Sequence, residues 1–172
     1  MSRRQTRLGF ALCLLGVLAA AFVVAAPLAA AAESEAGQKL PRFVSLRSDQ
    51  VNLRVGPGEN YPIEWVLTRK EMPVEIVKEF ENWRMIRDWQ GTEGWVHERM
   101  LTGKRAVVIK GGIRTLHRQP DPASPPVARA QPGVIAKLLE CRSDWCRIDA
   151  ADHAGWVQRG DLWGVYPDEI VQ

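Results

Sequence analysis

Hydrophobic and polar residues alternate along short stretches of this chain, as they do in strands that bury one face. Between Met72 and Lys78, for example, Val74 and Ile76 alternate with Glu75. Turn-forming pairs separate these stretches, among them Glu81-Asn82 and Gly91-Thr92. In the first half of the chain the pattern therefore predicts strands at Arg42–Leu46, Met72–Lys78, Trp83–Arg87 and Gly94–Val96.

The longest interruption of this pattern runs from Arg54 to Pro62 and contains Gly56, Pro57 and Gly58, so it is predicted to be a loop. Sustained helical periodicity is absent after residue 32. Short strands around one long loop suit an all-β domain of about 60 residues. Such a small domain needs a dense core, and we expect tryptophan to supply much of it.

The same pattern occurs twice in the chain. Gly94-Trp95-Val96 returns as Gly155-Trp156-Val157, and the offset between equivalent positions drifts only from 63 to 61 residues. This period is too long for solenoid units, which bury one face against a neighbour. The sequence therefore predicts two tandem domains, each with its own core, at residues 42–104 and 105–168, and a short tail at 169–172.

The N-terminal segment has the composition of a secretory signal. Arg3, Arg4 and Arg7 precede an uncharged stretch from Leu8 to Ala32. We predict a cleavable signal peptide over residues 1–32, a linker over 33–41, and a periplasmic or secreted protein. The alternative is an uncleaved membrane anchor, because the uncharged stretch is long enough to span a bilayer.

Removal of this signal changes the charge of the protein. The whole chain has 23 basic and 20 acidic residues, and three of the basic ones lie in the predicted signal. The mature chain is then close to neutral, which gives no support for binding to nucleic acid or to an anionic membrane. We expect no membrane insertion of the mature chain.

Two cysteines remain after the signal, Cys141 and Cys146. If the two residues between Arg142 and Trp145 form a hairpin turn, the cysteines are the next pair across the strands and their side chains lie close together. Because an exported protein permits disulfides, we predict a structural one here. The alternatives are two reduced thiols and, third, a redox or nucleophilic role.

The positions equivalent to the cysteines in the first repeat are Glu79 and Arg84. They predict an opposite-charge pair at the same rung of the hairpin. We expect this pair to be solvated, and to contribute well under about 1 kcal/mol.

One string of the first repeat resembles the signature of bacterial SH3 domains, which opens with Asn-x-Arg-x-Gly-Pro and closes with Gly-Trp-Val. In this sequence it reads Val51-Asn52-Leu53-Arg54-Val55-Gly56-Pro57-Gly58, followed by Trp83 and then by Gly94-Trp95-Val96. The resemblance extends over nearly the whole first repeat. It covers the closing half of the second repeat as well, including Leu162-Trp163-Gly164-Val165.

The opening of the second repeat departs from the signature. Thr115, His117 and Gln119 replace its asparagine, arginine and glycine, and five prolines follow between residues 119 and 132. The resemblance implies two tandem small SH3-like β-barrels after the signal peptide. It also implies binding rather than catalysis, since these domains commonly accompany cell-wall enzymes and hold peptidoglycan peptides or protein partners. The departure leaves a ligand role for the second loop unsupported.

The inventory of reactive residues agrees with a non-catalytic protein. The three histidines, His97, His117 and His153, are far apart and lack the spacing of metal ligands. The sequence has no nucleophile elbow, phosphate loop or zinc-protease motif. We therefore predict that the protein is not an enzyme, and that it needs no metal and no cofactor.

The candidate ligand-binding residues are Arg54, Tyr61, Trp65 and Trp89. Tyr61 and Trp65 lie at the end of the long loop, which borders the groove in SH3-like barrels, although they could instead pack the loop onto its own barrel. Trp89 lies in a polar segment where burial is difficult, which favours an exposed contact residue. Arg54 could bind a carboxylate or peptide carbonyl, but bracing of its own loop is the interpretation that we favour.

These observations favour a non-catalytic binding module of the cell envelope that recognises peptidoglycan peptide or a protein segment. The alternative is a structural adaptor that holds another envelope protein, with its two barrels packed together. The sequence does not determine the oligomeric state.

Overall fold

The computed structural model describes residues 38–172, all of which belong to one compact unit of the chain. These residues form two antiparallel sheets of seven strands each and two short 3-10 turns, with no α-helix in this part of the chain. No helix among the described residues is long and apolar enough to cross a membrane. The fold is all-β, as predicted, whereas the predicted signal peptide lies outside the described residues.

The first sheet is built from seven strands between residues 42 and 102. They are β1 (Arg42–Leu46), β2 (Val51–Arg54), β3 (Ile63–Leu67), β4 (Pro73–Phe80), β5 (Trp83–Arg87), β6 (Glu93–His97) and β7 (Leu101–Thr102), with the 3-10 turn η1 (Glu98–Met100) before the last. Their order across the sheet is β3-β2-β6-β5-β4-β1-β7.

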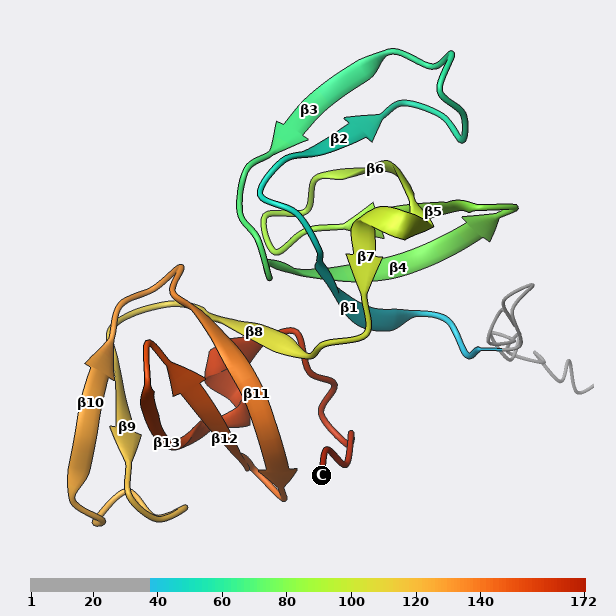
Figure 1. Cartoon of the computed structure of the whole chain (residues 1–172). Helices are drawn as coiled ribbons and strands as arrows, with labels where there is room; N and C mark the ends of the chain where they lie inside the picture. The colour runs from blue at the N-terminus through green and yellow to red at the C-terminus, as the bar shows by residue number, and fades with distance from the viewer. Residues whose placement is uncertain (1–37) are drawn as a thin grey trace, which may run out of the picture. The chain divides into compact units, whose positions relative to one another are not determined.

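The second sheet repeats this arrangement between residues 106 and 163. Its strands are β8 (Ala106–Ile109), β9 (Arg114–His117), β10 (Pro126–Ala130), β11 (Ile135–Arg142), β12 (Trp145–Ala150), β13 (His153–Gln158) and β14 (Leu162–Trp163), with η2 (Arg159–Asp161) before β14. The order β10-β9-β13-β12-β11-β8-β14 is that of the first sheet with every number raised by seven (Figure 1). The tandem repeat predicted from the sequence is therefore present in the fold.

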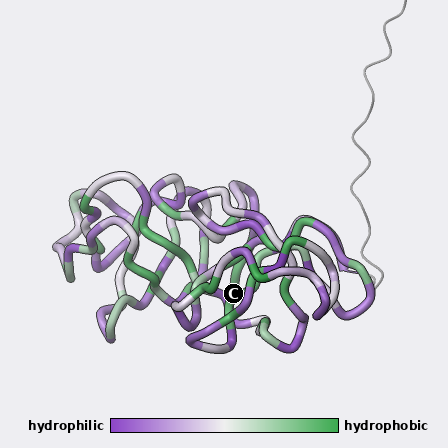
Figure 2. The backbone as a smooth tube through the Cα atoms, turned by 90° about the horizontal axis from the view of Figure 1, so that it is seen from above, coloured by the Kyte–Doolittle hydropathy of each residue, from purple (hydrophilic) through white to green (hydrophobic). Residues whose placement is uncertain are grey.

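Local sequence explains the main turns and the long loop. The β4–β5 and β11–β12 hairpins turn at Glu81 and Ser143, whose φ angles of 48° and 49° are tolerated by polar turn residues. The predicted long loop connects β2 to β3. Short hydrophobic and hydrophilic stretches follow one another along the described backbone (Figure 2).

Each repeat has its own core, and both cores are mainly aliphatic. The first contains Leu40, Val44, Leu46, Val51, Leu53, Met72, Val74, Ile76, Ile86, Val96 and Leu101. The second contains Val107, Ile109, Leu116, Ala130, Ala136, Leu138, Ile148, Val157 and Leu162 together with the two cysteines. The expectation that tryptophan supplies much of the core is wrong, because the residues next to Trp95 and Trp156 point inward and leave these rings on the other face of the sheet.

Side chains of the two repeats also touch. The Phe43 ring lies 5.0 Å from the Trp163 ring and 4.7 Å from the Tyr166 ring, measured between centroids. The Tyr166 hydroxyl donates a hydrogen bond of 2.8 Å to Glu75 Oε1. Burial and this hydrogen bond raise the pKa of Tyr166. Glu75, which the alternating pattern placed on a polar face, is consequently buried.

Candidate functional site

Arg54 braces the long loop between β2 and β3. Its Nη1 donates a hydrogen bond of 2.7 Å to the backbone oxygen of Tyr61, near the far end of the loop. The backbone N–H of Val55 donates to the backbone oxygen of Pro62 at 3.2 Å, which ties the two ends together a second time. This is the arrangement that the bracing interpretation of Arg54 requires.

The ring of Tyr61 lies on the two glycines of the loop. A Cβ atom added to Gly56 would come within 2.3 Å of Tyr61 Cδ1, and one added to Gly58 would come within 3.2 Å of Tyr61 Cδ2. Only glycine at position 56 leaves room for the ring. One side of Tyr61 thus packs on its own loop, yet the residue remains 43% exposed.

The second repeat has the same brace with different chemistry. His117 takes the place of Arg54, and its Nδ1 forms a hydrogen bond of 2.9 Å with the backbone oxygen of Ser124, again seven residues further along the chain. The Ser124 hydroxyl accepts from the backbone N–H of Gln119, and the Asp121 carboxylate accepts from that of Ala123. This loop is therefore closed by polar contacts and has no aromatic ring of its own.

A row of side chains crosses the outer face of the first sheet beside this loop. Strand pairing places Ile63 opposite Arg54, Arg54 opposite Trp95, and Trp95 opposite Met85. Directly opposite residues point to the same face, and Val96 points into the core, so these four side chains point away from it. We call these four residues the outer row. It combines apolar side chains with one arginine.

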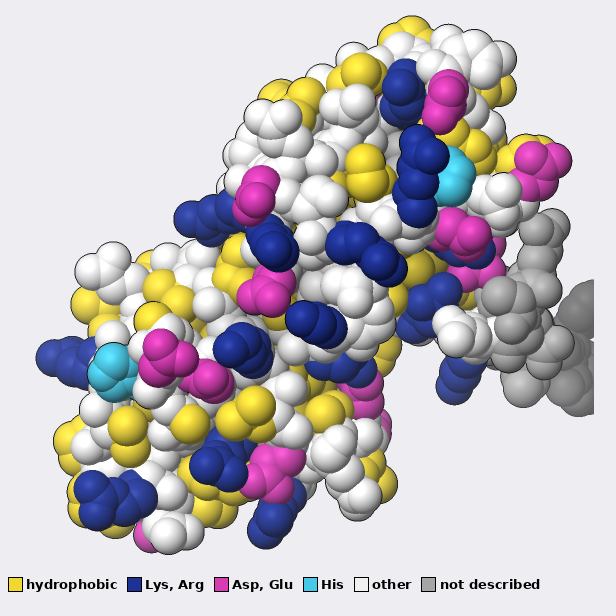
Figure 3. Space-filling view, in the orientation of Figure 1, with side chains coloured by type: hydrophobic (Ala, Val, Ile, Leu, Met, Phe, Trp, Pro, Cys, Tyr) yellow, Lys and Arg dark blue, Asp and Glu magenta, His cyan; other side chains and the backbone are white. Residues whose placement is uncertain are grey.

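The β2–β3 segment exposes four apolar side chains, of which Ile63 belongs to the outer row. Trp65 is 58% exposed and Ile63 47% exposed, and Val55 and Val66 are exposed to a similar degree. All four belong to β2, β3 or the loop between them, and hydrophobic side chains are visible on the surface over β3 (Figure 3). The first repeat therefore exposes apolar side chains along the segment that contains Arg54.

In the equivalent row of the second repeat, the tryptophan is covered. It pairs Pro126 with His117, His117 with Trp156, and Trp156 with Arg147. Arg142 lies over the Trp156 ring, with its guanidinium carbon 5.7 Å from the ring centroid, and only 7% of Trp156 is exposed. This face differs from that of the first repeat, because Arg142 covers its tryptophan and Arg147 stands in the row itself.

Sequence reasoning placed Trp89 on the surface, and the structure corrects this. Trp89 is only partly exposed and packs against the first core. The cause is a tight turn, in which the buried Asp88 carboxylate accepts hydrogen bonds of 2.9 Å and 2.8 Å from the backbone N–H groups of Gln90 and Thr92. Trp89 follows β5, whereas Arg54, Tyr61 and Trp65 all belong to the β2–β3 segment, in which a hydrogen bond joins Arg54 to Tyr61.

The paired cysteines form the predicted disulfide, at the predicted rung next to the pair of Arg142 and Trp145. Glu79 and Arg84 occupy the same rung in the first repeat, as expected. The expectation that they are solvated is wrong, because only 1% of the Glu79 side chain is exposed.

A network of charges encloses this pair. Arg42 Nη2 lies 2.8 Å from Glu79 Oε1, and Arg84 Nη2 lies 2.5 Å from Glu98 Oε2. The inward direction of this rung explains the burial, since the disulfide at the same position is part of the second core.

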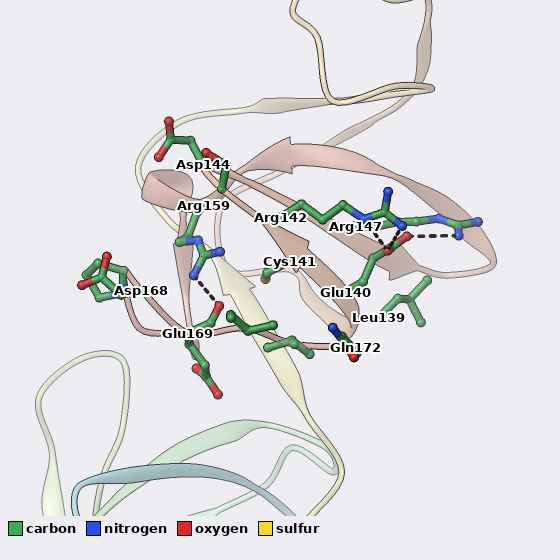
Figure 4. Close-up of a pocket in the computed structure, with 14 residues that line it drawn as sticks. Leu139, Glu140, Cys141, Arg142, Asp144, Arg147, Arg159, Asp168, Glu169 and Gln172 are labelled. Atoms are coloured by element: carbon green, nitrogen blue, oxygen red, sulfur yellow. Dashed lines mark hydrogen bonds and ion pairs between the residues drawn. The ribbon is translucent and has the colours of Figure 1, made fainter.

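An open cavity of about 970 Å³ lies on the second repeat between the β11–β12 hairpin and residues 167–172 (Figure 4). Its charged side chains mostly bind one another or the backbone: Arg142 and Arg147 both contact Glu140. Arg159 donates to the backbone oxygens of Tyr166 and Glu169. These contacts hold the C-terminal segment in place, which is a structural role.

The described residues contain no group of three or more histidine, cysteine or carboxylate side chains placed to hold a metal ion. His97, the histidine of the first repeat, lies against Trp83 with ring centroids 5.4 Å apart, and its Nδ1 accepts from the backbone N–H of Arg99.

The arrangement around Arg54 can bind a ligand through apolar contact and hydrogen bonds.

Sequence reasoning missed Trp95 and Met85 as parts of this surface. The signal was available, because Val96 and Ile86 are the inward-facing neighbours that force these two side chains to the outer face.

Comparison with known proteins gives a family match for both repeats. The family model described as "Bacterial SH3 domain" matches residues 47–103 and 110–164. No curated protein matches the chain.

Among solved structures, similarity is found to NlpC2 from Trichomonas vaginalis, with 12% identity and a TM-score of 0.35 over 75% of this chain and 50% of that one. NlpC1 from the same organism is 12% identical, with a TM-score of 0.32 over 80% and 50% of the two chains. An NlpC/P60 family protein from Bacillus cereus is also 12% identical, with a TM-score of 0.32 over 70% and 55%. The chain spans about half the length of these structures.

Proposed function

Because this chain belongs to the bacterial SH3 domain family, we propose that it is a non-catalytic binding module of the cell envelope, which recognises peptidoglycan peptide or an extended protein segment. The proposed site is on the first repeat and consists of the outer row together with Tyr61 and Trp65. It works in the periplasm or outside the cell, and the disulfide is compatible with such an oxidising compartment.

The observation that carries this proposal is the difference between the two repeats. Both keep the brace across the loop, through Arg54 in one and His117 in the other. In the first repeat the large aromatic side chains Tyr61 and Trp65 are exposed, whereas in the second Arg142 covers Trp156 and the exposed apolar side chains are aliphatic. An exposed apolar surface beside an arginine is typical of a binding site rather than of a structural face.

Sedimentation with purified peptidoglycan sacculi tests the proposal. The wild-type protein, purified after export, is expected to bind saturably, and the variant Tyr61→Ala/Trp65→Ala to lose binding while its near-ultraviolet circular dichroism shows a folded protein. The control variant Ile113→Ala/Val127→Ala removes two exposed apolar side chains of the second repeat and should bind as the wild type does. Undiminished binding by the Tyr61→Ala/Trp65→Ala variant would refute the site.

The contacts between the repeats favour a second function, that of a structural adaptor for another envelope protein. The Phe43, Trp163 and Tyr166 rings and the hydrogen bond from Tyr166 to Glu75 join the two repeats, as an adaptor with packed barrels requires. Failure to bind sacculi, combined with recovery of one defined envelope protein in a stoichiometric complex, would support this alternative.

A further inference from the structure

Arg54 uses only one of its three side-chain nitrogens to brace the loop. Its Nη1 donates to the backbone oxygen of Tyr61. Among the described residues, its Nε and Nη2 have no partner. These two nitrogens share one edge of the planar guanidinium, the edge that binds both oxygens of a carboxylate at once. The brace also fixes the orientation of the group, so little side-chain freedom remains to be lost when that edge binds a ligand.

The surroundings of Arg54 favour an incoming carboxylate over one from the protein. None of the ion pairs of the described residues joins a carboxylate to Arg54: Glu59 pairs with Arg99 at 3.5 Å, and Glu93 with Arg87 at 2.7 Å. Glu64, next to Ile63, forms no ion pair in the described structure. Ile63 and Trp95 flank Arg54 in the outer row, and apolar neighbours strengthen a charged hydrogen bond by excluding water.

The second repeat shows what the brace alone requires. A histidine at position 117 closes the loop with one nitrogen, and it offers no two-nitrogen edge for a carboxylate. One nitrogen is therefore enough for the brace, and the guanidinium at position 54 has further donors that the brace does not use.

We propose that the Nε and Nη2 edge of Arg54, beside Trp95, binds a carboxylate of the peptide ligand, with an aliphatic side chain of that peptide lying on Trp95 and Ile63. The inference rests on the proposed function and specifies its ligand as a peptide with an accessible carboxylate. A C-terminal carboxylate and an acidic side chain share this chemistry, and peptide probes separate them.

Isothermal titration with three synthetic probes tests the inference. The probes are N-acetyl-Lys-D-Ala-D-Ala, its C-terminal amide, and an amide of the same length with glutamate at the second position. A terminal-carboxylate site binds the acid roughly tenfold more tightly than either amide, which is the gain expected for a charged hydrogen-bonded pair. A site for acidic side chains prefers the glutamate peptide instead. Both results support a carboxylate site at Arg54 provided that the preference disappears in Arg54→His.

Arg54→His is the decisive variant because it gives the first repeat the brace of the second. It should keep the fold, retain weak binding and lose the preference for a carboxylate. Arg99→His, which changes an exposed arginine of the same repeat outside the outer row, serves as the control and should keep the preference. If Arg54→His does not fold, Arg54→Lys replaces it, since lysine keeps the charge and lacks the two-nitrogen edge.

The results of these titrations distinguish failure of the carboxylate site from failure of the proposed function. Equal binding of acid and amides by the wild type, or a preference that survives in Arg54→His and in Arg54→Lys, would overturn the carboxylate site and leave the proposed function in place. If the wild type binds neither these peptides nor sacculi, both are overturned.

Discussion

Glu79 and Arg84 form an ion pair of 3.3 Å at the rung of the first repeat that Cys141 and Cys146 occupy in the second. Both pairs point into their repeat, one as a buried charge network and the other as a disulfide within the core. The two repeats thus close the same hairpin by different chemistry. The charged version depends on every partner, because an unpaired buried charge is costly.

Removal of the Glu79 carboxylate should therefore destabilise the protein strongly. Glu79→Ala leaves Arg42 and the nine-tenths buried Arg84 without this partner, and we expect a loss of about 3 kcal/mol in the free energy of unfolding. Urea denaturation followed by tryptophan fluorescence measures it. The control Glu59→Ala, whose side chain is 72% exposed, should change stability by less than about 0.5 kcal/mol. Similar losses for the two variants would contradict the buried network.

The disulfide should stabilise the second repeat by a smaller amount. It closes a short loop, with a sequence separation of 5 between the cysteines, so the chain-entropy contribution is about 2 kcal/mol. We expect Cys141→Ser/Cys146→Ser to lower the unfolding free energy by that amount and to bind sacculi as the wild type does. A loss of binding without unfolding would show that the second repeat takes part in recognition.

Glu169 makes stability depend on pH. Burial alone would raise the pKa of this carboxyl, but hydrogen bonds from the Arg105 side chain and from the backbone N–H of Tyr166 hold it below its ordinary value of 4.5. A carboxyl with a lowered pKa in the folded state stabilises the protein above its unfolded pKa, and this contribution is lost as the pH falls through the folded pKa.

We therefore expect Glu169→Gln to lower the melting temperature at pH 7 and to reduce the further drop in stability between about pH 5 and pH 3. Thermal melts across this range, followed by circular dichroism, measure the effect. Asp168→Asn, one residue earlier and exposed, is the control and should follow the wild-type profile. A Glu169→Gln profile parallel to that of the wild type would argue against the role of Glu169.

The packing of Tyr61 on the loop predicts that Gly56 cannot be replaced without effect. In Gly56→Ala the new methyl group would displace the Tyr61 ring, which lies 2.3 Å from the position of that Cβ. We expect at least tenfold weaker binding to sacculi and a loss of about 1 kcal/mol in stability. Gly112→Ala, with no heavy atom within 4 Å of the new Cβ, should change neither quantity. An unaffected Gly56→Ala variant would show that Tyr61 has no part in binding.

Short-range patterns in the sequence were sufficient to predict the repeat, four of the seven strands of the first sheet and the disulfide rung. Alternation at Val74 and Ile76, the turn residues after β4 and the recurring Gly-Trp-Val each depend on neighbours in the chain. The loop between β2 and β3 and the brace by Arg54 follow from the signature in the same way.

What could not be predicted depends on contacts that are distant in sequence. Glu75 is buried because Tyr166, 91 residues away, donates to it. Trp89 is drawn inward by a carboxylate turn at Asp88, and Glu79 is enclosed by Arg42 and Arg84. Alternation gives the outward direction of Trp95 and Met85, but their place beside Arg54 is created by strand pairing and could be inferred only once the order of the strands was known.

Chemical-shift mapping with soluble peptidoglycan fragments tests the central claim most directly. In a ¹⁵N-labelled protein, each of the seven tryptophans of the chain gives a separate indole N–H signal. We expect the signals of Trp65 and Trp95 to shift saturably with added fragment, while that of Trp156, under Arg142, stays in place. Shifts confined to the second repeat, or no shift at Trp65 and Trp95, would contradict the assignment of recognition to the first repeat.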